Sequence, residues 1–311
     1  MTREFVAGID IGGTSISGVL ATPGGEVAAS ITVPAMTGRG GLAVLGQIPP
    51  LVRELEDRAG TKVTGVGVGA AGVIEAGTGR VLVASQVFRD WVGHRLADEL
   101  TATLGMTVTV ANDVNAFLLG EMRWGALKDV QDALGVMLGT GVGGAIVLQG
   151  RLLEGRFGGA GEIGHTPRYS DHVCTCGGIG HLETLASGRS LGLRYGERSD
   201  GIAVTGEEVA TRARAGDEDA RAVVDAAGWA LADALLAATT LLDISHVVVG
   251  GGVVAGAWDL LAPVVASRIA DNPPVSGRGL IVRPSQLRFP ALGAATLALP
   301  SSPFTAISEV S

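Results

Sequence analysis

One short design occurs twice in this chain: an apolar segment, a glycine turn and a second apolar segment. The first copy spans residues 4–22 around Gly12 and Gly13, and the second spans residues 133–150 around a run of glycines. Apolar runs joined by glycine turns predict pairs of antiparallel strands. The repetition predicts a chain built from two halves of similar design.

Strand-like and helix-like patterns alternate between the two copies. Residues 63–70 form a near-continuous apolar run, which is typical of a strand buried on both faces. A helical pattern over residues 94–105 follows, then a strand over 106–113 and a helix over 115–126. This alternation predicts an α/β fold.

The later half continues the alternation. Thr205 and Glu208 match a capping box, and residues 217–242 keep helical periodicity without an internal proline. Residues 244–252 are typical of a buried strand that enters a triple glycine, and a helix is expected near residues 257–270.

A chain of 311 residues is long enough for two domains. We expect an N-terminal α/β domain over residues 1–113, completed by a C-terminal helix over residues 291–300. The second α/β domain is expected over residues 114–290, and it carries both cysteines of the chain.

Composition excludes several classes of protein. Hydrophobic residues make up 47% of the chain and charged residues 17%, so general disorder is excluded. The formal net charge is −8 and no basic stripe appears, so we expect no nucleic-acid partner. The most apolar stretch, residues 231–249, is interrupted by Asp233, Asp243 and His246, so we expect no membrane span.

The two cysteines, Cys174 and Cys176, lie too close together for a useful disulfide. Their presence as a near-adjacent pair favours a reducing, cytoplasmic setting. The first residues lack the pattern of a secretory signal, which favours the same location.

The first glycine turn has the residues of a phosphate-binding loop. Phosphate oxygens need close backbone N–H groups, and glycine lets the main chain approach them. Gly12 and Gly13 supply such a turn, Thr14 adds a hydroxyl, and Asp10 adds a carboxylate suited to Mg²⁺. A plain hairpin is the alternative for this segment alone.

The second glycine turn, residues 139–144, favours a phosphate-binding loop over a plain hairpin. It offers Thr140 and Gly141 among further glycines. Two such loops, one in each half, suggest a nucleotide whose phosphates lie between the two domains.

Two segments imitate the dinucleotide fingerprint. Residues 67–72 fit G-x-G-x-x-G, but no helix is expected after them. A second triple glycine, which includes Gly251 and Gly252, does enter a helix, but Asp271 falls before the next strand rather than at its end. NAD is therefore disfavoured, and Gly251 and Gly252 are better explained as a surface on which a purine or a ribose lies flat.

An acidic residue stands where a buried strand passes into a helix. In open α/β sheets, ligands bind at the carboxyl ends of strands. Asp113, which follows Asn112 at such a point, is placed to take a proton from a substrate hydroxyl as a general base. The alternative is a helix N-cap, because Asn and Asp are favoured there.

A metal-binding pattern lies in the polar stretch of the second half. His165, Cys174, Cys176 and His181 offer two thiolates and two imidazoles within 17 residues, which suits tetrahedral Zn²⁺ in a closed, structural site. His172 is a competing ligand, and free thiols beside incidental histidines are the alternative. The neighbouring carboxylates of Glu162 and Glu183 suit hydrogen bonds from the hydroxyls of a polyhydroxyl ligand.

These motifs resemble the ROK family (repressor, open reading frame, kinase), most closely its glucokinase-type sugar kinases. The matching segments follow the family's order over nearly the whole chain: DIGGT at 10–14, GVGVGAAG at 65–72, ANDVNA at 111–116, LGTGVGG at 138–144, GEIGH at 161–165, CTCGGIGHLE at 174–183 and VVVGGGV at 247–253. Each glycine loop is weak alone, and the set together is specific.

The resemblance implies an actin-like ATPase (ribonuclease H-like) fold, in which two α/β domains enclose an active-site cleft. It implies transfer of the γ-phosphoryl group of ATP to a sugar hydroxyl, usually O6. Asp113 is then the general base. The residues implied to contact the sugar are Gly69, Asn112, Asp113, Glu162, His165 and Glu183.

The resemblance also implies the positions of the cofactors. Zinc, held by His165, Cys174, Cys176 and His181, orients the sugar-binding loop, with the second ring nitrogen of His165 toward the sugar. The groups implied around the ATP phosphates and Mg²⁺ are Asp10, Gly12, Gly13, Thr14, Thr140 and Gly141, with Gly251 and Gly252 near the nucleoside. A homodimer is the form that the family favours.

Two departures from the family pattern stand out. Ser15 replaces a frequent lysine after DIGGT, which removes one cation near the phosphates, and His181 replaces a usual cysteine, which still leaves a suitable zinc set. The DIGGT motif begins at residue 10, so no helix-turn-helix precedes it and a DNA-binding repressor is not expected.

Several functions remain open at this stage. Glucose is the favoured substrate, and N-acetylmannosamine, N-acetylglucosamine, fructose and allose are alternatives that the named residues do not separate. A polyphosphate-dependent kinase is a variant of the same hypothesis. A non-catalytic sugar sensor of the same fold is the alternative from another class: Ser15 favours it, and Asp113 argues against it.

Overall fold

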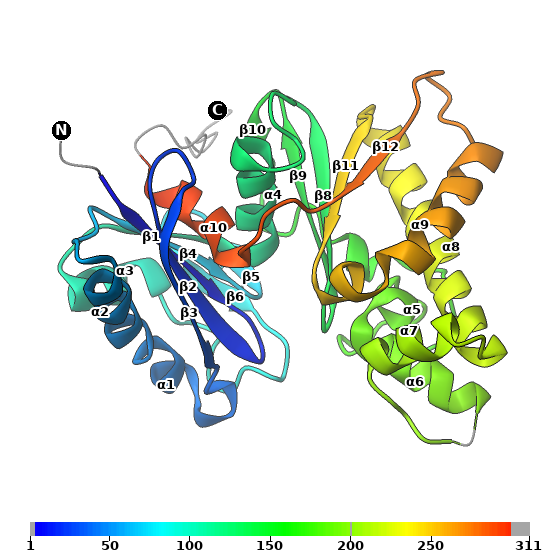
Figure 1. The fold of residues 1–311 in the computed structure, drawn as a ribbon, viewed down its shortest axis with the longest axis horizontal. Helices are drawn as coiled ribbons and strands as arrows, with labels where there is room; N and C mark the ends of the chain where they lie inside the picture. The colour runs from blue at the N-terminus through cyan, green and yellow to red at the C-terminus, as the bar shows by residue number, and fades with distance from the viewer. Residues whose placement is uncertain (1–3, 200, 300–311) are drawn as a thin grey trace. The chain divides into compact units, whose positions relative to one another are not determined.

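The computed structural model describes residues 4–199 and 201–299 (Figure 1). The chain forms two compact units. Unit 1 contains the residues up to Gln131, Ile146–Ala160 and the residues from Gln286, and unit 2 contains Asp132–Ala145 and Gly161–Ser285. This division differs from the expected boundary at residue 113, because the helix that begins there packs within unit 1.

Unit 1 is built on a five-stranded mixed sheet. Its order is β3-β2-β1-β4-β7, in which β1, β2 and β3 form an antiparallel meander and β4 and β7 run parallel to β1. The short turns that contain glycines explain the meander, since three residues connect β1 to β2 and five connect β2 to β3. The strands are β1 Val6–Ile11, β2 Ser15–Ala21, β3 Val27–Pro34, β4 Val66–Ala70 and β7 Val108–Asn112.

Helices cover both faces of this sheet. The helix α2 packs on β2 and β3, and α10 packs on β1, β2 and β4 (Figure 1). Pro49 and Pro50 lie in the first turn of α2, where a missing N–H costs nothing, so they start the helix rather than break it. The helices of unit 1 are α1 Gly41–Leu45, α2 Ile48–Ala59, α3 Leu96–Leu104, α4 Asp113–Trp124 and α10 Pro290–Ala295, with short 3₁₀ turns at Thr37–Arg39 (η1) and Thr296–Ala298 (η3).

Close packing against α10 explains several glycines of unit 1. A Cβ on Gly67 of β4 would overlap the carbonyl oxygen of Ala294, and a Cβ on Gly120 of α4 would lie 2.6 Å from the Cα of Gly293. These positions accept no side chain because the backbones themselves are in contact. A segment from the end of the chain therefore fits directly onto the first sheet.

A short hairpin in unit 1 is not anticipated by the sequence pattern. Residues 73–83 form β5 Val73–Glu75 and β6 Arg80–Val83, joined through Gly77 and Gly79, both with positive φ. Their strands of three and four residues are too short to show alternation. Residues 67–72 are followed by the strand β5 and not by a helix, so this segment is not a dinucleotide-binding loop.

The second five-stranded sheet has the order β10-β9-β8-β11-β12. The strand β11 is parallel to both β8 and β12, so their carboxyl ends share one edge. The strands are β8 Ala133–Leu138, β9 Val142–Leu148, β10 Arg151–Leu152, β11 His246–Gly250 and β12 Ile281–Pro284.

The helices of unit 2 lie within the metal-binding segment and after it in the chain. Thr205 caps α7, since its hydroxyl accepts the N–H of Glu208 at 3.1 Å, as the capping box predicts. The helix expected near residues 257–270 begins earlier, at Gly252. The helices are η2 Ile163–His165, α5 Glu183–Ala186, α6 Gly188–Arg198, α7 Gly206–Arg214, α8 Glu218–Leu242 and α9 Gly252–Asp271.

Two described helices, α8 and α9, are long and apolar enough to cross a membrane by length and composition alone. In unit 2 they pack against each other, and Arg268 of α9 donates two hydrogen bonds to Asp233 of α8, at 2.8 and 3.0 Å. Leu231 and Leu261 are buried in this packing. The core helices of a folded unit produce the same apolar pattern.

Candidate active site

Two carboxylates of unit 1 lie at the carboxyl ends of two parallel strands of the same sheet. Asp10 is the next-to-last residue of β1, and Asp113 follows the last residue of β7. The strand β4 lies between them, with Gly69 paired to Asp10 on one side and to Ala111 on the other. Burial, together with the negative charge of Asp113, raises the pKa of Asp10 to about 7.

Asn112 caps the helix that begins at Asp113. Its Oδ1 accepts the N–H groups of Val114 at 2.9 Å and Asn115 at 3.1 Å, and its Nδ2 donates to the carbonyl of Gly72 at 2.9 Å. The cap is thus Asn112, and Asp113 lies in the first turn, where its Oδ1 accepts the N–H of Val114 at 3.0 Å. The helix N-terminus suits a carboxylate.

Gly69 permits the close approach of β4 to the start of α4. A Cβ at this position would lie 3.3 Å from both the Cβ of Ala116 and the Cα of Asp113. That separation is tighter than ordinary contacts. Gly69 therefore lies directly beside Asp113, and it has a packing role independent of any ligand.

The first glycine turn is fixed by backbone hydrogen bonds. The N–H of Gly12 donates to the carbonyl of Ser15 at 3.0 Å, and the hydroxyl of Thr37 donates to the carbonyl of Gly13 at 3.2 Å. Neither Gly12 nor Gly13 has a positive φ, and a Cβ on Gly13 would make ordinary contacts with Val87 and Phe88. The fold alone thus does not require glycine at residue 13.

The second glycine turn lies in unit 2, between β8 and β9. The N–H of Gly139 donates to the carbonyl of Gly141 at 2.9 Å, which closes the turn. Thr140 is exposed at its tip. Beyond its chain neighbours, no described atom lies within 4 Å of a Cβ built on Gly139, so this side of the backbone is accessible.

The triple glycine has one structural and one open position. Gly251 has a φ of +90°, and a Cβ there would lie 2.5 Å from the carbonyl oxygen of Leu138, so the fold itself requires glycine. Around Gly252, the first residue of α9, no described atom lies within 4 Å of a built Cβ. A ligand can approach the backbone at Gly252 without obstruction.

The four expected metal ligands converge in unit 2. The ligand atoms of His165, Cys174, Cys176 and His181 all lie within 4.8 Å of one another. The Nδ1 atoms of the two histidines are 3.4 Å apart. The sulfurs of Cys174 and Cys176 lie 3.8 Å and 3.3 Å from the Nδ1 atoms of His165 and His181, respectively.

These separations match the edges of a tetrahedral zinc site. Normal bond lengths to Zn²⁺ place two nitrogens about 3.3 Å apart and a nitrogen and a sulfur about 3.6 Å apart. Two thiolates and two imidazoles also form a donor set that zinc prefers. The competing ligand, His172, is not part of the group and lies 3.9 Å from the carboxylate of Glu197.

The second ring nitrogen of His165 faces a carboxylate. Its Nε2 lies 3.8 Å from Oε2 of Glu162, while its Nδ1 lies among the metal ligands. Burial raises the pKa of Glu162, and the charge of Glu183 raises it further, whereas His165 lowers it. Glu162 and the Nε2 atom of His165 thus form one polar surface beside the metal group.

Glu183, the first residue of α5, makes contacts that the sequence does not indicate. One carboxylate oxygen accepts the N–H of Val142 at 2.9 Å, and the other accepts the hydroxyl of Thr175 at 2.9 Å. Sequence reasoning overlooks Thr175. The available signal is its position between Cys174 and Cys176, where a hydroxyl is held as firmly as the cysteines themselves.

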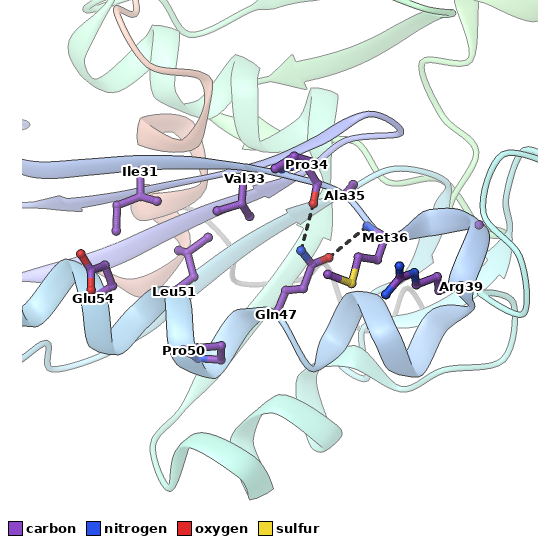
Figure 2. Close-up of a pocket in the computed structure, with 11 residues that line it drawn as sticks. Ile31, Val33, Pro34, Ala35, Met36, Arg39, Gln47, Pro50, Leu51 and Glu54 are labelled. Carbon is purple, nitrogen blue, oxygen red and sulfur yellow. Dashed lines mark hydrogen bonds between the residues drawn. The ribbon is translucent and has the colours of Figure 1, made fainter.

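A separate cavity of about 640 Å³ opens between β3, the segment around η1 and the helix α2 (Figure 2). Ile31, Val33 and Leu51 give it an apolar wall. Gln47 spans one end, where it donates to the carbonyl of Pro34 at 2.9 Å and accepts the N–H of Met36 at 3.0 Å. None of the residues expected to bind a ligand lines this cavity, so the candidate site lies elsewhere.

The sequence model of the ROK family matches residues 6–300, which is almost the whole chain. The chain belongs to the ROK family. Its glucokinase relative from Halalkalibacterium halodurans is 33% identical over 285 residues, with 85% of each chain covered. An N-acetyl-D-glucosamine kinase from Pectobacterium atrosepticum is 32% identical over 220 residues, which cover 67% of this chain and 71% of the relative.

Solved ROK structures show the same fold. The ROK family glucokinase from Streptomyces griseus, solved with glucose and AMPPNP, matches with a TM-score of 0.84 and 28% identity, over 94% of this chain and 99% of that one. The likeness to ROK kinases and the two α/β sheets confirm the expected actin-like ATPase fold.

Proposed function

We propose that this ROK protein is an ATP-dependent hexose kinase that transfers the γ-phosphoryl group to O6 of glucose. The observation that carries the proposal is the pair of carboxylates in unit 1. Asp113 begins a helix at the carboxyl end of β7, and Asp10 lies close enough for the charge of Asp113 to raise its pKa. The glucokinase relatives, which cover 85% of the chain, support glucose as the acceptor.

Asp113 acts as the general base. Its carboxylate takes the proton from the sugar hydroxyl while the hydroxyl oxygen forms a bond to the γ-phosphorus. The bond from this phosphorus to the β,γ-bridging oxygen breaks, and ADP leaves. The products are a sugar phosphate, ADP and a proton on Asp113. Phosphoryl transfer depends mainly on positioning and on charge neutralisation. In this proposal the base and the phosphate-binding loops supply the positioning.

Asp10 holds the magnesium ion in this proposal. A hard cation prefers oxygen ligands, and a carboxylate at the carboxyl end of β1 supplies one, either directly or through water. When bound, Mg²⁺ neutralises charge on the phosphates. The raised pKa of Asp10 fits this role, because a buried carboxylate without a cation favours its neutral form.

The glycine turns bind the phosphates and the nucleoside. The open backbone at Gly139 and Gly252 supports this assignment, since no described side chain blocks either position. The residues assigned to this task are Asp10, Gly12, Gly13, Thr14, Thr140, Gly141, Gly251 and Gly252.

The polar surface formed by Glu162 and His165 is assigned to the sugar. Glu162 and Nε2 of His165 accept or donate hydrogen bonds to ring hydroxyls, and their mutual distance of 3.8 Å supports a shared task. We assign Gly69, Asn112, Asp113 and Glu183 to the same ligand. Asn112 keeps a second Nδ2 hydrogen for a sugar oxygen beyond its bond to Gly72.

Zn²⁺ is the metal that the four-residue group would hold, through Nδ1 of both histidines and the sulfurs of Cys174 and Cys176. With four protein ligands, the site is structural, and it fixes the ring orientation of His165. We also propose a cytoplasmic location, which fits the free cysteines and the need for ATP. A homodimer is proposed from the resemblance to the ROK family.

The test is ADP release from ATP and Mg²⁺ with a panel of sugars: glucose, mannose, fructose, allose, N-acetylglucosamine and N-acetylmannosamine. Glucose should give the highest kcat/KM. Preference for an N-acetylhexosamine would move the assignment to the specificity of the Pectobacterium relative. Absence of turnover on every sugar, together with glucose binding in calorimetry, would replace the kinase with a sugar sensor.

A further inference from the structure

We propose that Glu183 is a positioning residue for the second glycine turn, and that Thr175 holds its carboxylate in place for this task. The turn comprises residues 139–142, and Thr175 lies between two metal-binding cysteines. The metal loop thereby sets the geometry of the nucleotide side of the reaction as well as that of the sugar side. This inference rests on the proposed function, in which the turn binds the phosphates of ATP.

The turn is held at both of its ends by one short segment. The N–H of Val142, where β9 begins, donates to Oε2 of Glu183 at 2.9 Å. At the other end, the carbonyl of Gly139 accepts the N–H of Gly188 at 2.8 Å. Glu183 and Gly188 are only five residues apart, at the starts of α5 and α6, so one rigid segment clamps the turn.

The fit between the turn and the carboxylate is close. A Cβ on Gly141 would lie 2.5 Å from Oε2 of Glu183. Gly141 does not have a positive φ, so this contact explains why the position has no side chain. Val142 is buried, so its N–H has no easy access to water if the carboxylate moves away.

The other carboxylate oxygen connects this clamp to the metal group. Oε1 of Glu183 accepts the hydroxyl of Thr175 at 2.9 Å, and the sulfur of Cys174 lies 3.7 Å from the same oxygen. A threonine between two metal ligands has little freedom once both cysteines are fixed. Its hydroxyl therefore fixes the Glu183 carboxylate in the orientation that reaches Val142.

A role in sugar binding alone predicts a different pattern of effects. If Glu183 served only the sugar, loss of the Thr175 hydroxyl would weaken glucose binding and leave the nucleotide unaffected. If Glu183 positions the turn, the same change weakens nucleotide binding and weakens the hydrogen bond from the N–H of Val142 to Glu183. The two roles are therefore separable by measurement.

The decisive variant is Thr175→Val, which removes the hydroxyl and keeps the shape. We expect the Kd for Mg–AMPPNP, measured by calorimetry, to rise about tenfold, while the Kd for glucose, which Glu183 also contacts in the proposed function, rises less, by about threefold. Amide hydrogen exchange at Val142, measured without nucleotide, should become faster. Thr175→Ser, which restores the hydroxyl, should return both values toward those of the wild type.

Thr166→Val is the matched control. The Thr166 hydroxyl donates to the carbonyl of Ile163 in the same loop and does not contact Glu183. This variant should leave the Kd for Mg–AMPPNP and the exchange at Val142 unchanged. Glu183→Gln, a second variant with the same shape but no charge, should also raise the Kd for Mg–AMPPNP and accelerate exchange at Val142. Its Kd for glucose should rise as well, because the proposed function assigns Glu183 to the sugar.

Unchanged nucleotide affinity and unchanged exchange at Val142 in both Thr175→Val and Glu183→Gln would overturn the inference. Equal weakening of glucose and nucleotide in Thr175→Val would overturn it as well, since it would indicate general damage to the loop. Failure of the proposed function is recognised separately: the wild-type protein itself would then neither bind Mg–AMPPNP nor phosphorylate any sugar.

Discussion

Asp10 and Asp113 carry the same chemical group, but their surroundings suit different tasks. Asp113 lies at a helix N-terminus, where backbone N–H groups favour negative charge. Asp10 lies within the sheet, where burial raises its pKa to about 7. A buried carboxylate with a raised pKa close to a second carboxylate is typical of functional sites.

Replacement of Asp113 tests the general base. Asp113→Asn keeps the size of the side chain but cannot accept the proton, so kcat should fall about 10³-fold. The Kd for glucose, measured by calorimetry, should change little because hydrogen bonds to the amide remain available. Turnover near the wild-type rate in this variant would exclude Asp113 as the base.

The raised pKa of Asp10 predicts a pH dependence of stability. The folded chain binds the Asp10 proton more tightly than the unfolded chain does, whose carboxyl has a pKa near 3.8. Without Mg²⁺, the free energy of unfolding of unit 1 should therefore fall as pH rises from about 4 to about 7, by about 4 kcal/mol at most. Urea denaturation at pH 4 and pH 8 measures this difference.

Asp10→Asn is the control for this dependence, because an amide does not titrate. The variant should lose the slope between these two pH values. Asp113→Asn should lower the pKa of Asp10, since it removes a neighbouring negative charge, and should shift the slope toward lower pH. A wild-type protein whose stability rises over this range would contradict the assignment.

At the scale of elements, the contact between β4 and α10 sets the tightest packing of unit 1. Gly67→Ala places a methyl group against the carbonyl of Ala294, which is backbone and cannot move aside. We expect a loss of about 3 kcal/mol in the free energy of unfolding. Chemical denaturation measures it.

Gly65→Ala is a matched control two residues earlier in the chain. A Cβ there would make only ordinary contacts, 3.5 Å from Ala298, and Gly65 does not have a positive φ. This change should be neutral within about 1 kcal/mol. Equal destabilisation by both substitutions would mean that the contact with α10 is looser than the structure indicates.

The elements that the sequence predicts well are those with a local physical cause. Thr205 caps α7 as its spacing with Glu208 indicates, and the glycine turns give the antiparallel meander. The start of α9 is missed by about five residues, because the triple glycine suggests a loop. Gly252 nevertheless begins the helix, since Gly251 before it adopts a positive φ of +90° that only glycine takes readily.

In the candidate site too, the sequence predicts the features that depend on local spacing and misses those that depend on the fold. Spacing alone indicates the four metal ligands, whose atoms converge as expected. It does not distinguish Asn112 from Asp113 as the cap, because both residue types suit that position. It also overlooks Thr175, whose role depends on a contact between Glu183 and Val142, two residues that lie 41 positions apart and that only the fold brings together.

At the scale of the whole molecule, the metal group should control the stability of one unit only. Its four ligands all belong to unit 2, so removal of the metal by a strong chelator should lower the melting temperature of unit 2 and accelerate exchange over residues 161–188. Exchange in β1, β4 and β7 of unit 1 should remain unchanged. Exchange mass spectrometry distinguishes the two regions.

Substitution provides the matching chemical test. Cys176→Ser should lose the metal, measured by elemental mass spectrometry, and should weaken glucose binding. His172→Ala should retain it, because His172 faces Glu197 rather than the four ligands. Full metal content in Cys176→Ser would exclude the zinc assignment.

The contribution of the last helix to the first sheet has a consequence for protein synthesis. Val6 and Val19, near the N-terminus, are buried against Ala291 and Leu292. The ribosome completes the strands of unit 1 at residue 112 but adds α10 only from residue 290 onward, a delay on the order of ten seconds or more at typical bacterial rates. During that interval the nascent chain exposes an apolar sheet face, which is the kind of surface that chaperones bind at the tunnel exit.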